Sequence, residues 1–196
     1  MRNEVVKLKG KKVKFNIYRE ARELNEIIPE LPPDNEVIKI ISHGRLSSIA
    51  FIKYVAEHTK IKSLYASSLR IGKKHIAILD QLHKRGQLEN ATFVVGSVMK
   101  NDSKIGKSYQ YYQTLLGVAQ KNDWQIVVKN NHSKIFLFDT DNGKFVLETS
   151  SNLNECPNIE QFSFEKSDEL YGLYLPVFEE FLREQEEKEN TSILEE

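Results

Sequence analysis

Two hydrophobic patterns follow one another along this chain of 196 residues, and their order limits the fold more than any other feature. From residue 36 to 121, short apolar runs alternate with segments whose apolar side chains recur at helical spacing. From residue 124, runs rich in β-branched and aromatic residues follow one another with turn residues between them. We therefore expect strands over 36–41, 63–69, 91–98, 124–128, 133–138, 144–149 and 159–164, and helices over 49–56, 73–85, 107–121 and 168–182.

Strands that alternate with helices and are then followed by consecutive strands predict an α/β fold. We expect an α/β/α sandwich, in which helices cover both faces of a mixed sheet. Pro32 and Pro33 cannot continue a helix or a central strand, so the main domain is expected over 36–182. Six Lys or Arg among the first 14 residues predict a basic extension over 1–35, which either contacts phosphates or is simply solvated. The Glu-rich end predicts an acidic, disordered tail over 183–196.

Composition excludes several classes of protein. Twenty-eight basic and 28 acidic side chains give no net charge, which removes the simple argument for a polyanion-coating role. A single cysteine, Cys156, allows neither an intrachain disulfide nor a Cys-rich zinc site. No apolar run approaches the ~20 residues that span a bilayer, and the N-terminus lacks an apolar signal core. We expect a cytoplasmic protein with no membrane partner, no metal and no cofactor.

The polar residues that can carry chemistry gather in the second half of the chain. Residues two apart in a strand point the same way, so His132 and Lys134 share a face, and Ser150 and Asn152 share one on the returning segment. Lys134 offers charge, the serine and asparagine offer neutral donors, and His132 can attack phosphorus or transfer a proton. Glu160 is expected to orient His132.

Three further residues complete the set of candidates. Asp139 follows His132 by seven positions, which places it on the opposite strand face and gives it a supporting or structural role among the catalytic candidates. His43 and Arg45 follow a strand end, where α/β folds often bind ligands, and are expected to guide substrate or only to form a turn.

The pattern His132-x-Lys134-x4-Asp139, followed by Ser150-x-Asn152 and Asn158-x-Glu160, resembles the HxKx4D, GSxN and NxE signature of the phospholipase D superfamily. This resemblance implies a metal-independent phosphodiester reaction through a phosphohistidine intermediate. A single motif copy is similar to the short bacterial nuclease branch, in which two chains form one composite site, as an isologous homodimer can. Thr149 stands where the signature has glycine.

The expected function is therefore that of a nuclease that hydrolyses nucleic acid, with DNA preferred to RNA as the partner. Three alternatives stay open. Thr149 favours a degenerate module that binds nucleic acid or protein without cleavage, and superfamily membership allows a lipid phosphodiesterase, which the lack of an amphipathic membrane helix disfavours. The third is a phosphoryl-transferring or partner-regulating role.

Overall fold

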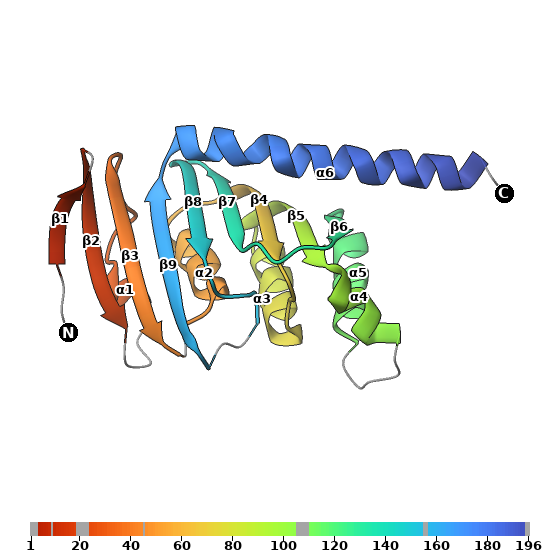
Figure 1. The fold of residues 1–196 in the computed structure, drawn as a ribbon, viewed down its shortest axis with the longest axis horizontal. Helices are drawn as coiled ribbons and strands as arrows, with labels where there is room; N and C mark the ends of the chain where they lie inside the picture. The colour runs from red at the N-terminus through yellow and green to blue at the C-terminus, as the bar shows by residue number, and fades with distance from the viewer. Residues whose placement is uncertain are drawn as a thin grey trace.

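The computed structural model describes residues 4–8, 10–18, 24–44, 46–104, 110–154 and 157–194, and its strands form one sheet of nine within these ranges. Their order is β1-β2-β3-β9-β8-β7-β4-β5-β6 (Figure 1). The strands are β1 (Glu4–Leu8), β2 (Lys11–Tyr18), β3 (Glu36–His43), β4 (Ile61–Ser68), β5 (Leu88–Gly96), β6 (Gln125–Lys129), β7 (Ile135–Thr140), β8 (Gly143–Thr149) and β9 (Ile159–Lys166). The helices are α1 (Leu24–Ile27), α2 (Ser48–His58), α3 (Lys73–Lys84), α4 (Ser97–Lys104), α5 (Tyr111–Asn122) and α6 (Asp168–Leu194).

Parallel and antiparallel pairs are mixed in this sheet, as the change of pattern at residue 124 predicts. β2 with β3, β4 with β5, and β5 with β6 are parallel, whereas β7, β8 and β9 pair antiparallel with their neighbours. These last three strands lie between β3 and β4. The carboxyl ends of β3, β4, β5, β6 and β8 therefore meet the first residues of β7 and β9 at one edge, which we call the carboxyl edge.

Two hydrophobic clusters show that helices cover both faces. Phe51 of α2, Leu79 of α3 and Leu115 of α5 belong to a cluster that also contains Phe136 and Phe138 of β7. On the other face, α6 packs with Tyr171 and Phe178 among side chains from four strands: Val94, Val127, Leu137 and Val146. Alternate residues of β7 thus enter opposite clusters. The prediction of a mixed α/β fold with helices on both faces of the sheet is confirmed (Figure 1).

The segment expected as a basic extension instead adds two strands to the sheet. β1 and β2 form an antiparallel pair, and β2 continues the sheet alongside β3. Three lysines of β2 are paired with carboxylates: Lys12 and Lys14 pair with the buried Glu36 at 3.2 and 2.5 Å, and Lys11 pairs with Glu165. These pairs lie at the edge opposite the carboxyl edge, because β2 and β3 both begin there.

The acidic end also differs from the expectation of a disordered tail, because α6 runs without interruption through Pro176 to Leu194. Glutamate and lysine favour helix, and Lys129 of β6 pairs with Glu184, while Gln185 donates to the Ile126 carbonyl at 2.9 Å. Within the described part of the chain, no helix has both the length and the apolar composition needed to cross a membrane, although α6 has 27 residues.

Candidate functional site

The motif residues gather at the carboxyl edge because of the strand order. β7 lies between β8 and β4, so residues 132–134, which precede β7, sit between the end of β8 and the end of β4. The Thr149 amide donates to the Lys134 carbonyl at 3.1 Å, which ties the two segments together. Adjacent strand ends are about 5 Å apart, so side chains from all three segments can reach one small ligand.

The segment from Ser150 to Leu153 crosses the start of β7 to reach residues beyond β4. Leu153 forms a parallel bridge with Ile71, its amide donates to Ser68 Oγ at 2.9 Å, and its carbonyl accepts from the Gly72 amide at 2.8 Å. Ser48 Oγ, in the first turn of α2, donates to the Ser151 carbonyl at 2.7 Å. The crossing segment is therefore fixed to the starts of α2 and α3, and it continues from Thr149, which is bonded to Lys134.

His132 and Lys134 contact each other, as their spacing predicts. Lys134 Nζ lies 3.0 Å from His132 Nδ1 and 2.6 Å from the His132 carbonyl oxygen. An ammonium group can only donate, so Nδ1 accepts and the ring proton of the neutral imidazole sits on Nε2. His132 is exposed, whereas Lys134 is 7% exposed. A buried cation thus stands directly behind an accessible imidazole.

Asn152 has a fixed amide orientation. Its Oδ1 accepts from the Leu69 amide at 3.2 Å and lies 3.5 Å from Ser68 Oγ. Because a backbone N–H can only donate, the atom that faces Leu69 must be the carbonyl oxygen. The Nδ2 donor of Asn152 is therefore not the atom that bonds to Leu69 and Ser68.

Ser150 is committed to Glu160. Its hydroxyl donates to Glu160 Oε2 and accepts from the Gln161 amide at 3.1 Å. Among the described residues, Glu160 therefore holds Ser150 rather than orienting His132, which departs from the expected contact. A hydroxyl has one proton, so Ser150 can donate to a phosphate only if it leaves Glu160.

Thr149, which replaces the motif glycine, has a structural use. Its Oγ1 donates to the Gln161 carbonyl at 2.6 Å and accepts from the Ser151 amide at 3.0 Å, so it closes the turn at the end of β8. Ser151, the other serine that could fill the motif position, is fully buried, with its Oγ 3.2 Å from the Asn152 carbonyl. This burial favours the alignment in which Ser150 is the motif serine.

Asp139 and His43 are not brought into this cluster. Asp139 lies opposite Ser63 and Lys144, five residues along β7 from Lys134, which corresponds to about 16 Å in a strand. His43 is exposed and lies opposite Ile159, so it occupies the sheet face opposite to that of the neighbouring pair Ser42 and Glu160. Arg45 lies outside the described residues.

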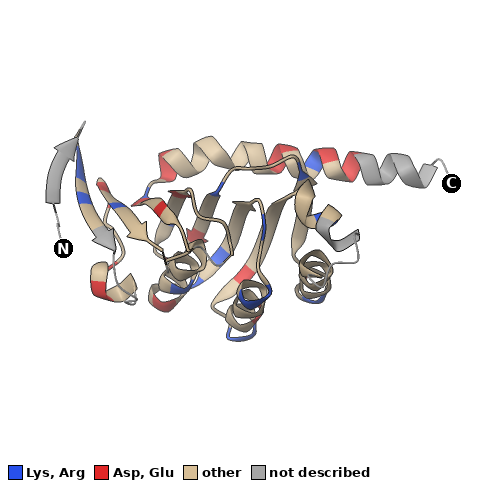
Figure 2. Cartoon of the chain, turned by 60° about the horizontal axis from the view of Figure 1, so that its bottom comes forward, with Lys and Arg blue, Asp and Glu red and all other residues tan. Residues whose placement is uncertain are grey.

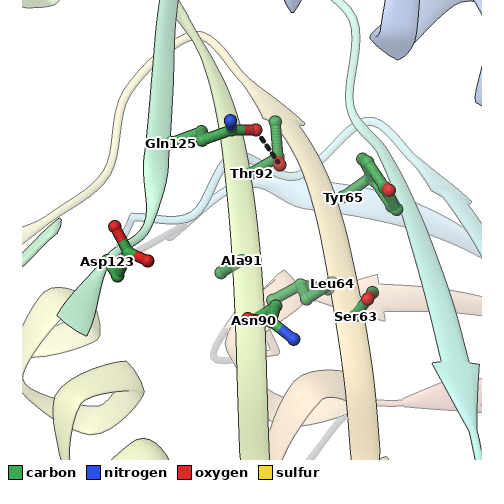
Figure 3. Close-up of a pocket in the computed structure, with 8 residues that line it drawn as sticks. All are labelled: Ser63, Leu64, Tyr65, Asn90, Ala91, Thr92, Asp123 and Gln125. Carbon is green, nitrogen blue, oxygen red and sulfur yellow. Dashed lines mark hydrogen bonds between the residues drawn. The ribbon is translucent and has the colours of Figure 1, made fainter.

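A cavity lined by described residues away from the carboxyl edge does not suit a phosphate. Lys and Arg are interspersed with Asp and Glu over the helices and strands (Figure 2). A cavity of about 300 Å³ lies toward the opposite edge, between the early parts of β4 and β5, and Figure 3 shows its lining. Its polar groups are hydroxyls, amides and the carboxylate of Asp123, without Lys or Arg, so it does not suit an anion. In the described ranges, no three His, Cys, Asp or Glu are placed to hold a metal ion.

Comparison with known proteins adds little to this geometry. No protein-family model and no curated protein matches the chain. Among solved structures, a polyphosphate kinase from Porphyromonas gingivalis is similar, with 12% identity and a TM-score of 0.47. The match covers 68% of this chain and 23% of the kinase chain, so this chain spans less than a quarter of its length. A likeness of this size does not establish a shared family or activity.

Proposed function

We propose that this chain is a metal-independent phosphodiesterase that hydrolyses nucleic acid at the carboxyl edge. The observation that supports the proposal is the contact between His132 and Lys134 before β7, beside the crossing segment that carries Asn152. A nucleophile or acid, a buried cation and a neutral donor are the groups that phosphoryl transfer requires. The motif resemblance to the phospholipase D superfamily supports the same reaction.

The chemistry needs two histidines, which a homodimer with its twofold axis near His132 would supply. One His132 attacks phosphorus through Nε2 while the second copy's His132 gives its Nε2 proton to the departing oxygen, and the P–O bond breaks. Water then attacks the phosphohistidine, with its proton taken by the histidine that acted as acid. The acid must be the charged imidazolium, with a proton on each ring nitrogen, and the nucleophile must be neutral with its proton on Nδ1. Both forms carry a proton on Nδ1, so in each copy Lys134 would move from Nδ1 to a phosphoryl oxygen when substrate binds.

The first test is hydrolysis of a chromogenic phosphodiester in excess EDTA, followed by single- and double-stranded DNA, RNA and phosphatidylcholine vesicles. We expect wild type to cleave the chromogenic substrate and nucleic acid, DNA above RNA, and His132→Ala to abolish cleavage. His58→Ala is the matched control, because His58 ends α2 and contacts the Tyr54 carbonyl instead of the site. Strict dependence on a divalent ion, or full activity of His132→Ala, would refute the proposal, and cleavage of vesicles alone would assign a lipid substrate.

A second candidate is a nucleic-acid-binding module without turnover, and the bond from Ser150 to Glu160 favours it. If the hydroxyl stays with the carboxylate, the site keeps a cation and an amide for a phosphate but lacks one donor for the transition state. This candidate predicts tight, salt-dependent binding of DNA with no cleavage between pH 5 and 9. Nuclease activity that disappears in His132→Ala would exclude it.

A further inference from the structure

Asn131, Ser67 and Ser133 form a closed ring of hydrogen bonds around His132 that the sequence analysis did not single out. Asn131 Nδ2 donates to Ser67 Oγ at 3.0 Å, Ser67 Oγ lies 2.5 Å from Ser133 Oγ, and Ser133 Oγ donates to Asn131 Oδ1 at 2.7 Å. We call these three residues the Asn131 ring.

The donor and acceptor roles of Asn131 in the ring have one assignment. The Ser133 amide donates to Asn131 Oδ1 at 2.9 Å, which fixes that atom as the carbonyl oxygen. The second Nδ2 proton goes to the Val94 carbonyl at 3.1 Å. Ser133 gives its proton to Asn131 Oδ1, so Ser67 is the donor toward Ser133, whose Oγ lies at 2.5 Å and whose carbonyl oxygen lies at 3.3 Å. A fully satisfied network of this kind is rigid, because each bond polarises the next and none of the three side chains can turn alone.

The ring holds the residue that precedes His132 and the residue that follows it. The bond from the Ser133 amide to Asn131 Oδ1 closes an Asx turn with His132 at its centre. Ser67, which is 4% exposed, and Val94 anchor that turn to the ends of β4 and β5. Gly96 permits the close approach: a Cβ there would lie 2.8 Å from the Leu69 carbonyl oxygen and 3.2 Å from that of Asn131.

We infer that Asn131 and Ser67 are positioning residues, which hold His132 so that Lys134 meets both its carbonyl oxygen and its Nδ1. This inference rests on the proposed function for its effect on turnover. The tautomer of His132 follows from the geometry alone, since a fixed turn keeps Nδ1 at 3.0 Å from the ammonium and the proton on Nε2. Loosening the turn should release Nδ1 and let the other tautomer appear.

The test compares substitutions in the Asn131 ring, which is bonded to the carboxyl-terminal parts of β4 and β5, with substitutions near the starts of these two strands. Asn131→Asp removes both Nδ2 donations, and Ser67→Ala removes the centre of the ring. Their controls are Asn90→Asp, whose Nδ2 donates to the Lys62 carbonyl at 3.1 Å, and Ser63→Ala, since Ser63 and Asn90 are partners far from the carboxyl edge. Ser133→Ala is a third test at an exposed position, where misfolding is least expected.

Two measurements are made on each variant. In ¹⁵N NMR of the histidine rings, with His132 assigned by its loss in His132→Ala, wild type and both controls should show the Nε2–H tautomer. The three ring variants should show a growing Nδ1–H population. On a phosphodiester, kcat should fall on the order of 10²-fold for Asn131→Asp and Ser67→Ala with KM little changed, because misplacing a reacting group mainly affects the transition state.

The two proposals fail separately. If the ring variants keep the wild-type tautomer, the positioning inference is overturned whether or not the protein is an enzyme. If the tautomer shifts as expected while wild type cleaves no phosphodiester, the inference stands and the proposed function fails. A loss of kcat equal in the controls and the ring variants would also overturn it, because the effect would then belong to the strands and not to the ring.

Discussion

Replacing Lys134 by methionine should separate activity from stability. Methionine keeps most of the aliphatic length of lysine and removes the charge. The ammonium makes bonds of 2.6 and 3.0 Å to the carbonyl oxygen and Nδ1 of His132, and bonds from a charged donor contribute about 1.5–3 kcal/mol each. Against this, an ion that is only 7% exposed loses several kcal/mol of solvation. The two terms are similar in size and opposite in sign, so we expect the free energy of unfolding to change by less than about 1.5 kcal/mol.

The effect on turnover should be much larger. Lys134 is the cation that would meet the charge developing on the phosphoryl oxygens, and losing such a group lowers the rate by about 10²–10³. Urea unfolding at constant m-value measures the free energy of unfolding, and hydrolysis of a chromogenic phosphodiester measures turnover. Lys166→Met is the control, because Lys166 pairs with the exposed Asp34 at 3.3 Å and should change neither by much. If Lys134→Met loses more than about 3 kcal/mol of unfolding free energy, or keeps turnover within tenfold of wild type, the reasoning is refuted and Lys134 is a structural residue.

Three other outcomes follow from the described geometry. Asn152→Asp should lower turnover by about 10²-fold or more, because it replaces the Nδ2 donor by an anion beside the phosphate; rates equal to wild type would remove Asn152 from the site. Hydrogen bonds from Lys84, Asn122 and Lys121 lower the pKa of Asp80 to about 2, so its contribution is complete above the unfolded-chain pKa of about 4 and is lost as the pH falls toward 2. Asp80→Asn should therefore lower the free energy of unfolding by about 1 kcal/mol at pH 7, and this free energy should fall less steeply in acid than that of wild type. Urea unfolding at several pH values measures both, and an unchanged acid dependence would contradict the pairing. Phe164→Ala should lower the free energy of unfolding by about 3–5 kcal/mol, because Phe164 is fully buried against Phe51 and Phe145. A loss below about 1 kcal/mol would show that neighbouring side chains move to fill the cavity.

The sequence predicts the elements of the fold better than their arrangement. Hydrophobic periodicity locates β3 to β9 and the four helices α2, α3, α5 and α6, because it reflects which face of each element is buried. β2 is missed although its polar and apolar residues alternate from Lys12 to Ile17 as in a strand, because the high density of lysines favours a solvated extension. The insertion of β7, β8 and β9 between β3 and β4 is not visible in any local pattern, because strand pairing depends on distant segments.

For the candidate site, the spacing of His132 and Lys134 is enough to predict that they share a face, and their contact agrees with it. The partner of Glu160 could not be predicted in this way. Whether its carboxylate reaches Ser150 or His132 depends on the turn at the end of β8, which Thr149 shapes. The Asn131 ring escaped notice for the same reason, since Ser67 and Asn131 are 64 residues apart in sequence.

The crossing segment from Ser150 to Leu153 also has a consequence for synthesis of the chain. Leu153 is joined to Ser68 across 85 residues of sequence, and Ser150 is held by Glu160 on the strand that follows. A nascent chain that carries His132 and Lys134 but ends before β9 has these two residues without the crossing segment in place. Contacts between such distant segments form late, after the loops between them have closed. A truncated or half-made copy would therefore carry His132 and Lys134 without the segment that completes the candidate site.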